Sequence, residues 1–249
     1  MLTRRQIMRL ASRNKIPGYT QERDYIQTLF LYCLYPEEDI VFKGGTALRL
    51  VHKNNRYSED LDFNSYTEKT EDMIQRTADR LNSFGIKAQI KDKEIYEDSY
   101  SSRLVYKGPL FVPGEKGKGG IEIDVSLREE SIEKETRLVS SQYDDVNDFL
   151  VTVLTLEHIT AEKIRALIIR KKARDLYDLW VLLEKGIEIE KKLLDKKLGS
   201  YDRGFESTEL EEAIKDVEDG WERDLRTLLP SIPEYESISS MVMEKLRYL

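Results

Sequence analysis

The sequence lacks the features that mark secreted and membrane-spanning chains. Its single cysteine, Cys33, cannot form an internal disulfide and lies in an apolar run, so we place it in the core. No apolar run approaches the roughly 20 residues that a membrane-spanning helix needs. The first ten residues also lack the apolar segment of a signal peptide. We therefore expect a cytoplasmic protein that does not associate with membranes.

Histidine and excess positive charge are also scarce. His52 and His158 are the two histidines, and no Cys/His cluster of the kind that binds zinc is present. With 40 basic and 47 acidic residues the net charge is −7, which argues against a general nucleic-acid coat protein. One local exception runs from Lys163 to Arg174, with six basic and no acidic residues. It is either a solvated helix face or an RNA contact.

The most informative stretch begins with the apolar run Ile40 to Phe42, which predicts a buried strand. Gly44 and Gly45 follow, and they allow a tight turn and the close approach of a ligand. Thr46 is expected to be the N-cap of a helix that continues to Val51. A strand, a glycine pair and a helix N-terminus together form an anion site, because free N–H groups and the positive helix end face one spot.

A pair of carboxylates follows about a dozen residues later. Asp60 and Asp62 alternate with Leu61 and Phe63, which predicts a strand with both carboxylates on one face, roughly 7 Å apart. Two hard oxygen ligands so placed suit a Mg²⁺ ion that carries the phosphates of a substrate. Each motif alone is common in purely structural roles, and it is their combination that is informative.

Joined at this spacing, the two motifs resemble the signature of the polymerase-β-like nucleotidyltransferase superfamily. That superfamily requires a third carboxylate on a later strand. Asp124, in the apolar alternation from Ile121 to Leu127, can supply it. Glu122 shares the same face and remains the alternative, although the central position of Asp124 in the strand favours Asp124.

The rest of the chain indicates two parts. Strands are expected at 86–90, 103–106 and 121–127, and helices at 3–13, 21–35 and 68–83. After residue 150 the pattern is helical, so we predict an α/β domain over 1–150 and a helical domain over 151–249. Between two strands, residues 114–120 hold four glycines with Lys116 and Lys118. This loop is either a flexible hairpin or a mobile basic flap.

A further block, from His158 to Trp180, completes a more specific resemblance. It reads I-T-A-E-K-I-R-A-L-I-I-R-K-K-A-R-D-L-Y-D-L between those residues. Together with Gly-Gly-Thr, Arg56-x-Ser58-x-Asp60-x-Asp62 and Asp124, it resembles the AbiEii/AbiGii toxin family. These are nucleotidyltransferase-like proteins of toxin–antitoxin and phage-abortive systems. The resemblance runs from about Phe42 to Leu183.

The resemblance implies a fold and a set of functional residues. The fold is a mixed sheet with flanking helices, the polymerase-β-like nucleotidyltransferase fold, followed by a helical C-terminal domain. Ser58 and Asp60 match the family's Ser-x-Asp element, Lys163 its Glu-Lys element and Asp175 its Arg-Asp element. The expected catalytic residues are Ser58, Asp60, Asp62, Asp124, Lys163 and Asp175. The nucleotide would contact Lys43, Gly44, Gly45, Thr46 and Lys163, and the metal, Mg²⁺ or Mn²⁺, would bind Asp60, Asp62 and Asp124.

Several of these residues also have structural interpretations that the sequence leaves open. Lys163 could be a surface lysine that pairs with Glu162 or Glu157. Asp175 could cap the helix that follows it, and Asp178 could pair with Arg174 four residues earlier. Ser58 could be a turn residue at the start of a strand.

We expect an enzyme that transfers a nucleotidyl group from an NTP to a hydroxyl of a macromolecule, releasing pyrophosphate. RNA is the expected acceptor, with the 3′ end of a tRNA the favoured case, and a cognate antitoxin is a candidate partner. Two alternatives remain open at this point. One is a catalytically inactive module of the same fold that binds a nucleotide or a partner, and the other is a kinase-like phosphoryl transferase.

Overall fold

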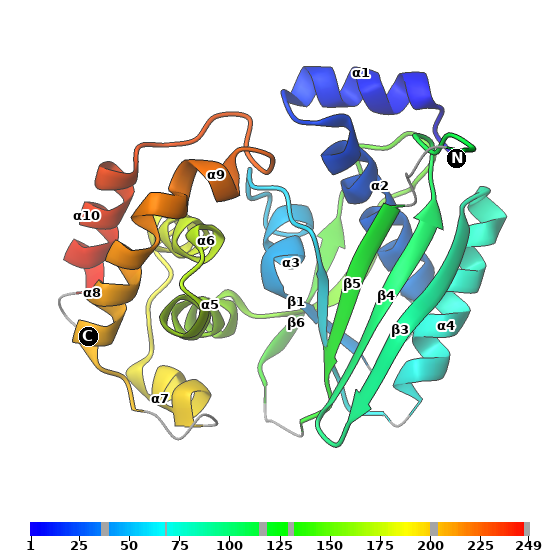
Figure 1. Ribbon diagram of the computed structural model, residues 1–249. Helices are drawn as coiled ribbons and strands as arrows, with labels where there is room; N and C mark the ends of the chain where they lie inside the picture. The colour runs from blue at the N-terminus through cyan, green and yellow to red at the C-terminus, as the bar shows by residue number, and fades with distance from the viewer. Residues whose placement is uncertain (36–39, 68, 115–118, 129–131, 200–203, 247–249) are drawn as a thin grey trace. The chain divides into compact units, whose positions relative to one another are not determined.

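The computed structural model describes residues 1–35, 40–67, 69–114, 119–128, 132–199 and 204–246. The chain divides into two compact units, Met1–Leu154 and Thr155–Leu249 (Figure 1). A boundary at residue 150 would cut the last strand of the first unit, β7 (Phe149–Leu154), so the division falls after that strand instead. Lys116 and Lys118 of the expected basic flap lie outside the described residues.

The first unit contains both helices and strands. Its helices are α1 (Arg4–Asn14), α2 (Gly18–Leu34), α3 (Gly44–Leu50), α4 (Thr70–Arg80) and the 3₁₀ helix η1 (Leu81–Phe84). Its strands are β1 (Ile40–Lys43), β2 (Leu61–Ser65), β3 (Lys87–Tyr96), β4 (Ser99–Lys107), β5 (Gly119–Ser126), β6 (Lys134–Val139) and β7.

The strands form one mixed sheet in the order β3-β4-β5-β2-β1-β7-β6. β2 runs parallel to β5 and β1 parallel to β7, and the other neighbouring pairs are antiparallel. Helices α2 and α4 contact each other, and both pack on the sheet (Figure 1). The expected mixed sheet with flanking helices is thus present, and its central strands β5, β2 and β1 carry the sequence motifs.

Period-two alternation explains why β2 and β5 form and how they are oriented. Leu61 and Phe63 of β2 are buried, as are Ile123 and Val125 of β5. Asp62 and Asp124 alternate with them, so both carboxylates project from the opposite face of the sheet. That face is the one available for chemistry, because the apolar residues bury the other face.

The two N-terminal helices begin in different ways. Thr3 caps α1 through a capping box with Gln6, as its sequence indicates. Thr20 does not cap the next helix, because α2 begins at Gly18, directly after Pro17. Thr20 is instead buried inside α2. A proline that precedes the first turn provides a favourable entry into a helix, and it sets the start of α2 three residues earlier than Thr20 suggests.

Two strands, β6 and β7, were not expected from the sequence. β6 is an edge strand with the sequence K-E-T-R-L-V, whose charged residues give no clear apolar alternation. β7 reads F-L-V-T-V-L and leads after one residue into a helix, so its apolar run is ambiguous between strand and helix. Both segments are strands because β6 pairs with β7, and β7 also pairs with β1.

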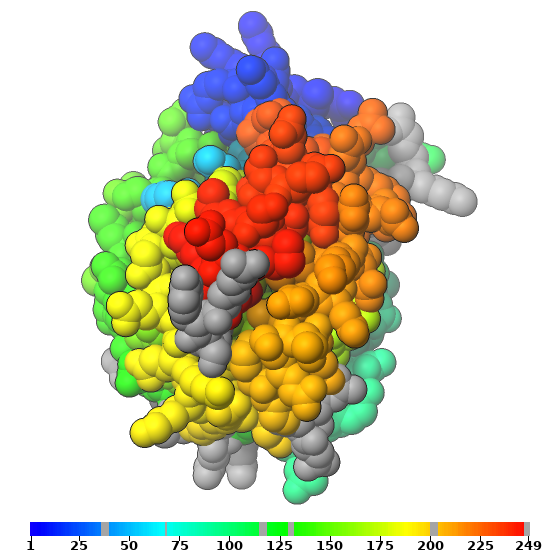
Figure 2. Space-filling model, turned by 90° about the vertical axis from the view of Figure 1, so that its left-hand side faces the viewer, coloured from blue at the N-terminus to red at the C-terminus, as the bar shows by residue number. Residues whose placement is uncertain are grey.

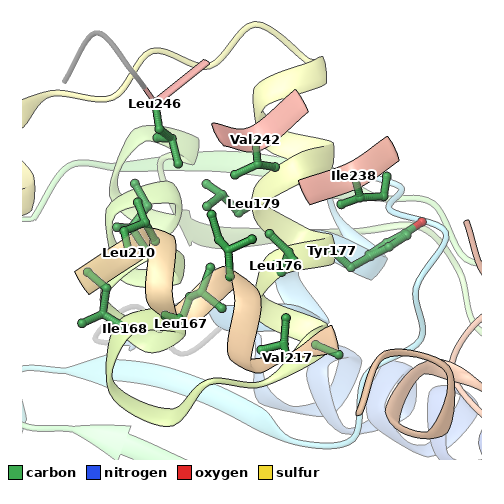
Figure 3. Close-up of a cluster of buried hydrophobic side chains, with 14 of the residues drawn as sticks. Leu167, Ile168, Leu176, Tyr177, Leu179, Leu210, Val217, Ile238, Val242 and Leu246 are labelled. Carbon is green, nitrogen blue, oxygen red and sulfur yellow. The ribbon is translucent and has the colours of Figure 1, made fainter. Parts of the chain in front are cut away.

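The second unit is helical in its described residues. Its elements are α5 (Leu156–Arg170), α6 (Ala173–Glu184), α7 (Lys191–Gly199), α8 (Ser207–Asp216), η2 (Glu218–Gly220), α9 (Trp221–Leu225) and α10 (Tyr235–Leu246). They enclose a separate apolar core, in which Leu167 and Ile168 of α5 lie near Leu176 and Leu179 of α6 (Figure 3). Helix α10, red in Figure 2, covers this core beside α8, which is orange.

Among the described residues, no helix is long and apolar enough to cross a membrane.

Candidate functional site

The Gly44–Gly45 pair joins β1 to α3 and is pressed against three side chains. Gly44 has a φ of +75°, a conformation that residues with a Cβ rarely adopt. A Cβ on Gly44 would overlap the carboxylate of Asp62. A Cβ on Gly45 would lie 2.5 Å from Arg56 Nη2 and 2.8 Å from Ser58 Oγ. The glycines therefore let Asp62, Arg56 and Ser58 approach the first turn of α3.

Thr46 has a different role from the expected one. The N-cap of α3 is Lys43, so the helix begins at Gly44 and Thr46 lies inside its first turn. The Thr46 hydroxyl is buried and donates a hydrogen bond to the carbonyl oxygen of Asp60. Thr46 therefore ties α3 to the residue that leads into β2, and only its backbone N–H remains to serve a phosphate.

The carboxylates of β2 and β5 meet across neighbouring strands. Asp62 pairs in register with Asp124, and such partners lie about 4.8 Å apart between backbones. On its other side Asp62 pairs with Lys43 of β1. Asp60 lies two residues before Asp62, just ahead of β2. The sheet thus places Asp62 and Asp124 side by side, next to the glycine turn.

Glu122 and Asp124, which sequence alone could not separate, have different surroundings. Glu122 pairs in register with Arg103, and their side chains form an ion pair of 3.1 Å. Burial raises the pKa of Glu122, Arg103 opposes this, and the charges of Asp60 and Asp124 raise the pKa further. Asp124 is exposed and accepts a 2.7 Å hydrogen bond from Ser101 Oγ. The register with Asp62 favours Asp124 as the third carboxylate.

The segment that carries Ser58 and Asp60 is held by α2. Arg23 of α2 forms a 2.7 Å ion pair with Glu59. Gln27, one turn further along α2, donates to the carbonyl oxygens of Ser58 and Asp60, each at 3.4 Å. The buried Arg56 donates to the carbonyl oxygen of Tyr57 at 2.8 Å. These contacts fix the backbone between α3 and β2, on which the position of Asp60 depends.

These residues fit a divalent ion that arrives with a nucleotide. Across the described residues, no group of three or more His, Cys, Asp or Glu side chains forms a ready-made metal cage. Mg²⁺ is usually held by one or two carboxylates together with substrate phosphates, and Asp62 and Asp124 offer that number of oxygen ligands at adjacent positions. The metal role of Asp60, Asp62 and Asp124 stays a prediction.

The second unit contains a buried ion network around Lys163. Lys163 Nζ lies 3.1 Å from Asp175 Oδ1 and 2.8 Å from Asp178 Oδ2. The side chain of Lys163 is 7% exposed, and both carboxylates are fully buried. Arg170 completes the network with two 2.7 Å contacts from Nε and Nη2 to the two oxygens of Asp175.

The network sets the charge state of Asp175. Burial alone would raise the pKa of this carboxyl, but the positive charges of Lys163 and Arg170 hold it well below its usual range. Asp175 is therefore ionised in the folded protein and fixes the position of the Lys163 ammonium.

The structure contradicts two of the structural alternatives, the surface position of Lys163 and the cap at Asp175. Lys163 is not a surface lysine, because its side chain is buried and pairs with Asp175 and Asp178. Asp175 does not cap the following helix, since α6 starts at Ala173 with Lys172 as its cap. Asp178 forms an ion pair with Lys163, which lies in the preceding helix, α5. The sequence did not suggest this pair.

The basic run from Lys163 to Arg174 is not one helical face. Helix α5 ends at Arg170, and Lys171 adopts a left-handed conformation with a φ of 49°. Arg170 is bound to Asp175, and Lys171 lies 2.5 Å from Asp216. Two of the charges expected to meet RNA are thus engaged with carboxylates of the protein.

Sequence reasoning missed two partners in these sites. Arg170 was assigned to the basic run and not to Asp175, and Asp178 was assigned to Arg174. A usable signal was present, because Asp175 and Asp178 lie three apart on the buried face of α6. Two carboxylates on an apolar helix face require a buried cation.

Comparison with known proteins identifies the family. Residues 30–244 match the family described as "Nucleotidyl transferase AbiEii toxin, Type IV TA system". The chain belongs to this family. It is therefore a nucleotidyltransferase of the AbiEii toxin family, and membership implies an NTP substrate and an antitoxin partner.

Individual proteins are also similar to this chain. A protein of Aquifex aeolicus (strain VF5), described as "Uncharacterized protein aq_aa25", is 27% identical over 212 residues, which are 79% of this chain and 88% of that protein. The structure of MenT4, nucleotidyltransferase toxin Rv2826c from Mycobacterium tuberculosis H37Rv, superposes with a TM-score of 0.73 at 20% identity, covering 100% of this chain and 89% of MenT4. JHP933 from Helicobacter pylori gives 0.60 at 21%, covering 94% and 95%. At these identities the two structures show a shared fold.

Proposed function

We propose that this nucleotidyltransferase transfers a nucleotidyl group from an NTP to a hydroxyl of RNA, with the 3′ end of a tRNA as the favoured acceptor. The observation that carries the proposal is the register of Asp62 and Asp124 beside the Gly44–Gly45 turn. It combines oxygen ligands for a cation with the N–H groups of a helix start, which suit a triphosphate.

The residues of the first unit have distinct roles in this proposal. The backbone N–H groups of Gly44, Gly45 and Thr46 bind phosphate oxygens, and the Lys43 ammonium adds positive charge next to Asp62. Asp62 and Asp124, with Asp60 beside them, hold Mg²⁺. When bound, Mg²⁺ neutralises charge that builds up on the phosphate oxygens. Ser58, packed against Gly45, positions the turn and the triphosphate.

The family resemblance assigns one residue of the second unit, Lys163, to the triphosphate. A lysine ammonium is a compact point charge that suits this task. Asp175 and Asp178 hold its ammonium within 3.1 Å.

In the proposed reaction one bond to phosphorus forms and one breaks. The acceptor hydroxyl oxygen forms a bond to the α-phosphorus, and the bond from that phosphorus to the oxygen bridging to the β-phosphate breaks. Pyrophosphate leaves, and the hydroxyl proton passes to a carboxylate of the site. Catalysis of this kind consists mainly of positioning and charge stabilisation, which the residues of the first unit supply in this proposal.

The test uses NTPs labelled separately at the α and γ positions, incubated with the protein, Mg²⁺, total RNA and cell extract. We expect α-label on RNA and none from the γ position. Label from the γ position alone would replace the proposal with a kinase reaction, and no label from either would indicate a nucleotide-binding module without turnover. Label on protein alone would overturn the RNA acceptor and leave nucleotidyl transfer in place.

A further inference from the structure

The first 21 residues have a charge opposite to that of the rest of the chain. They contain five of the 40 basic residues, at positions 4, 5, 9, 13 and 15, and none of the 47 acidic ones. The remaining residues therefore hold 35 basic against 47 acidic residues. Four of the five cations are arginines of helix α1, and all five residues are exposed.

Three of these arginines have no partner in the part of the chain that the structure describes. Among the described residues, no hydrogen bond or ion pair engages Arg5, Arg9 or Arg13, whereas arginines such as Arg23, Arg103 and Arg128 each pair with a carboxylate. Arg5, Arg9 and Arg13 are spaced by four residues along α1. They therefore form one stripe, with steps of about 6 Å along the helix axis.

Helix stability accounts for only one member of this stripe, because Arg13 lies in the last turn, where the negative end of a helix favours a basic side chain. The first turn of α1 contains Arg4 and Arg5 and no acidic residue, although the positive end of a helix favours acidic side chains. Like charges four residues apart also repel each other. The charges therefore cost some stability, which points to a role outside the folding of α1.

The location of α1 connects it with the nucleotide site of the same unit. Arg4 Nη1 donates to the carbonyl oxygen of Leu110, in the connection from β4 to β5, at 3.2 Å. β5 and β2 are parallel, and β1 is antiparallel to β2. The starts of β5 and β2 and the end of β1 at Lys43, next to Gly44, therefore lie at this same end of the sheet. Figure 1 shows α1 at that end.

A hollow lies beside two residues of the arginine stripe, Arg9 and Arg13. It has a volume of about 580 Å³, with Gln6, Arg9 and Arg13 on the α1 side and Gln142 and Asp144 opposite. Arg9 and Arg13 make no ion pair with Asp144 in the part of the chain that the structure describes. The arginines are thus available to a ligand that enters this hollow.

We propose that α1 binds the phosphate backbone of the RNA acceptor through Arg5, Arg9 and Arg13. Guanidinium groups bind phosphates in a bidentate manner, and most contacts to nucleic acids are of this sequence-independent kind. A membrane surface is less suitable, because the apolar side of α1, with Ile7 and Ala11, is already buried in the protein. The proposal rests on the proposed function, and it concerns a helix outside the family match, which begins at residue 30.

The test compares two triple variants in RNA binding and α-label transfer. In Arg5→Ala/Arg9→Ala/Arg13→Ala we expect RNA affinity to fall by tenfold or more. The slope of log affinity against log salt concentration should become shallower by about two, because three contacts to phosphates are lost. NTP binding and the melting temperature should not fall, because the three side chains are exposed and unpaired. The control Lys185→Ala/Lys192→Ala/Lys196→Ala removes the same charge from exposed sites of the second unit and should bind RNA normally.

Three outcomes would overturn the inference. The first is normal RNA affinity in the arginine variant, and the second is an equal loss in the lysine control. The third is retained RNA transfer together with lost binding to phosphatidylglycerol vesicles, which would make α1 a membrane-surface helix. Absence of α-label from RNA in the wild-type protein would instead disprove the proposed function. A further variant with lysine at the three positions should retain most of the salt dependence and lose part of the affinity.

Discussion

Asp62 and Asp124 bring two negative charges to directly opposite positions of neighbouring strands. Such pairs of like charge destabilise a sheet, so their presence in the folded protein indicates a role that requires them. The same reasoning applies to Lys163, whose burial costs free energy that Asp175 and Asp178 recover. The two sites differ in kind, because the first is open to a cation and the second is internally neutralised.

The first prediction separates Asp124 from Glu122. Asp124→Asn should reduce nucleotidyl transfer by about a hundredfold or more, the scale of a lost charge-stabilising group. Its melting temperature should stay level or rise, because the repulsion with Asp62 is relieved. Glu122→Gln is the matched control and should retain transfer, since Glu122 pairs with Arg103. The reverse order of activities, measured with α-labelled NTP, would assign the third carboxylate to Glu122.

The second prediction concerns Asp175 and pH. Asp175→Asn should lower the free energy of unfolding of the second unit by about 3–5 kcal/mol at pH 7, because it leaves buried Lys163 with one carboxylate. The pKa of Asp175 is lowered in the folded protein. Its ionised form therefore stabilises the fold above about pH 4, and this contribution is lost as the pH falls below that value.

The measurement for Asp175 uses tryptophan fluorescence. Both tryptophans of the chain, Trp180 and Trp221, lie in the second unit and report on its unfolding by denaturant. The difference between wild type and variant should be largest near neutral pH and shrink below pH 4. A difference that is constant with pH would show that the ion network does not stabilise this unit.

At the scale of elements, the turn from β1 to α3 determines where the carboxylate of Asp62 can lie. Gly44 combines a positive φ with contact to Asp62, whereas Gly186 has a φ of +78° and open space around its Cα. A substitution at Gly186 therefore tests backbone strain alone, whereas the same substitution at Gly44 adds a clash with Asp62.

The third prediction uses this pair. Gly44→Ala should abolish transfer, because its Cβ displaces the Asp62 carboxylate. Gly186→Ala carries a similar backbone cost of roughly 1–2 kcal/mol and should retain transfer at a temperature at which both variants are folded. Circular dichroism establishes that temperature, and transfer of α-label gives the activity. Equal activities of the two variants would contradict the proposed role of the glycine turn.

At the scale of the whole molecule, each unit has its own core. The apolar cluster of the second unit is built from residues between Ile164 and Leu246, which lie entirely in that unit. The sheet residues of the first unit form the other core. We therefore expect a substitution that destabilises the core of one unit to leave the stability of the other unit unchanged.

The fourth prediction tests this independence. Leu179 is fully buried in the second core (Figure 3), so Leu179→Ala should cost roughly 2–5 kcal/mol. Hydrogen exchange should then accelerate across residues 155–249 and remain unchanged across 1–154. Acceleration of similar size in both ranges would show that the units unfold as one.

The sequence by itself determined the elements whose signals are local. The Gly-Gly turn, the alternation around Asp62 and Asp124, the cap at Thr3 and the helices α5 and α6 follow from patterns within a few residues. The family could also be inferred, because its motifs are short and their order along the chain is visible. The resemblance placed Ser58, Lys163 and Asp175 in a candidate site, and their roles there stay predictions.

Only the tertiary structure decided the features that depend on distant partners. The register that sets Asp62 opposite Asp124 and Glu122 opposite Arg103 is fixed by strand pairing across the sheet. β6 and β7 are strands because they pair with each other, and Lys163 is buried because α6 brings two carboxylates to it. In each case the free energy comes from contacts between residues far apart in the chain, which a local pattern cannot specify.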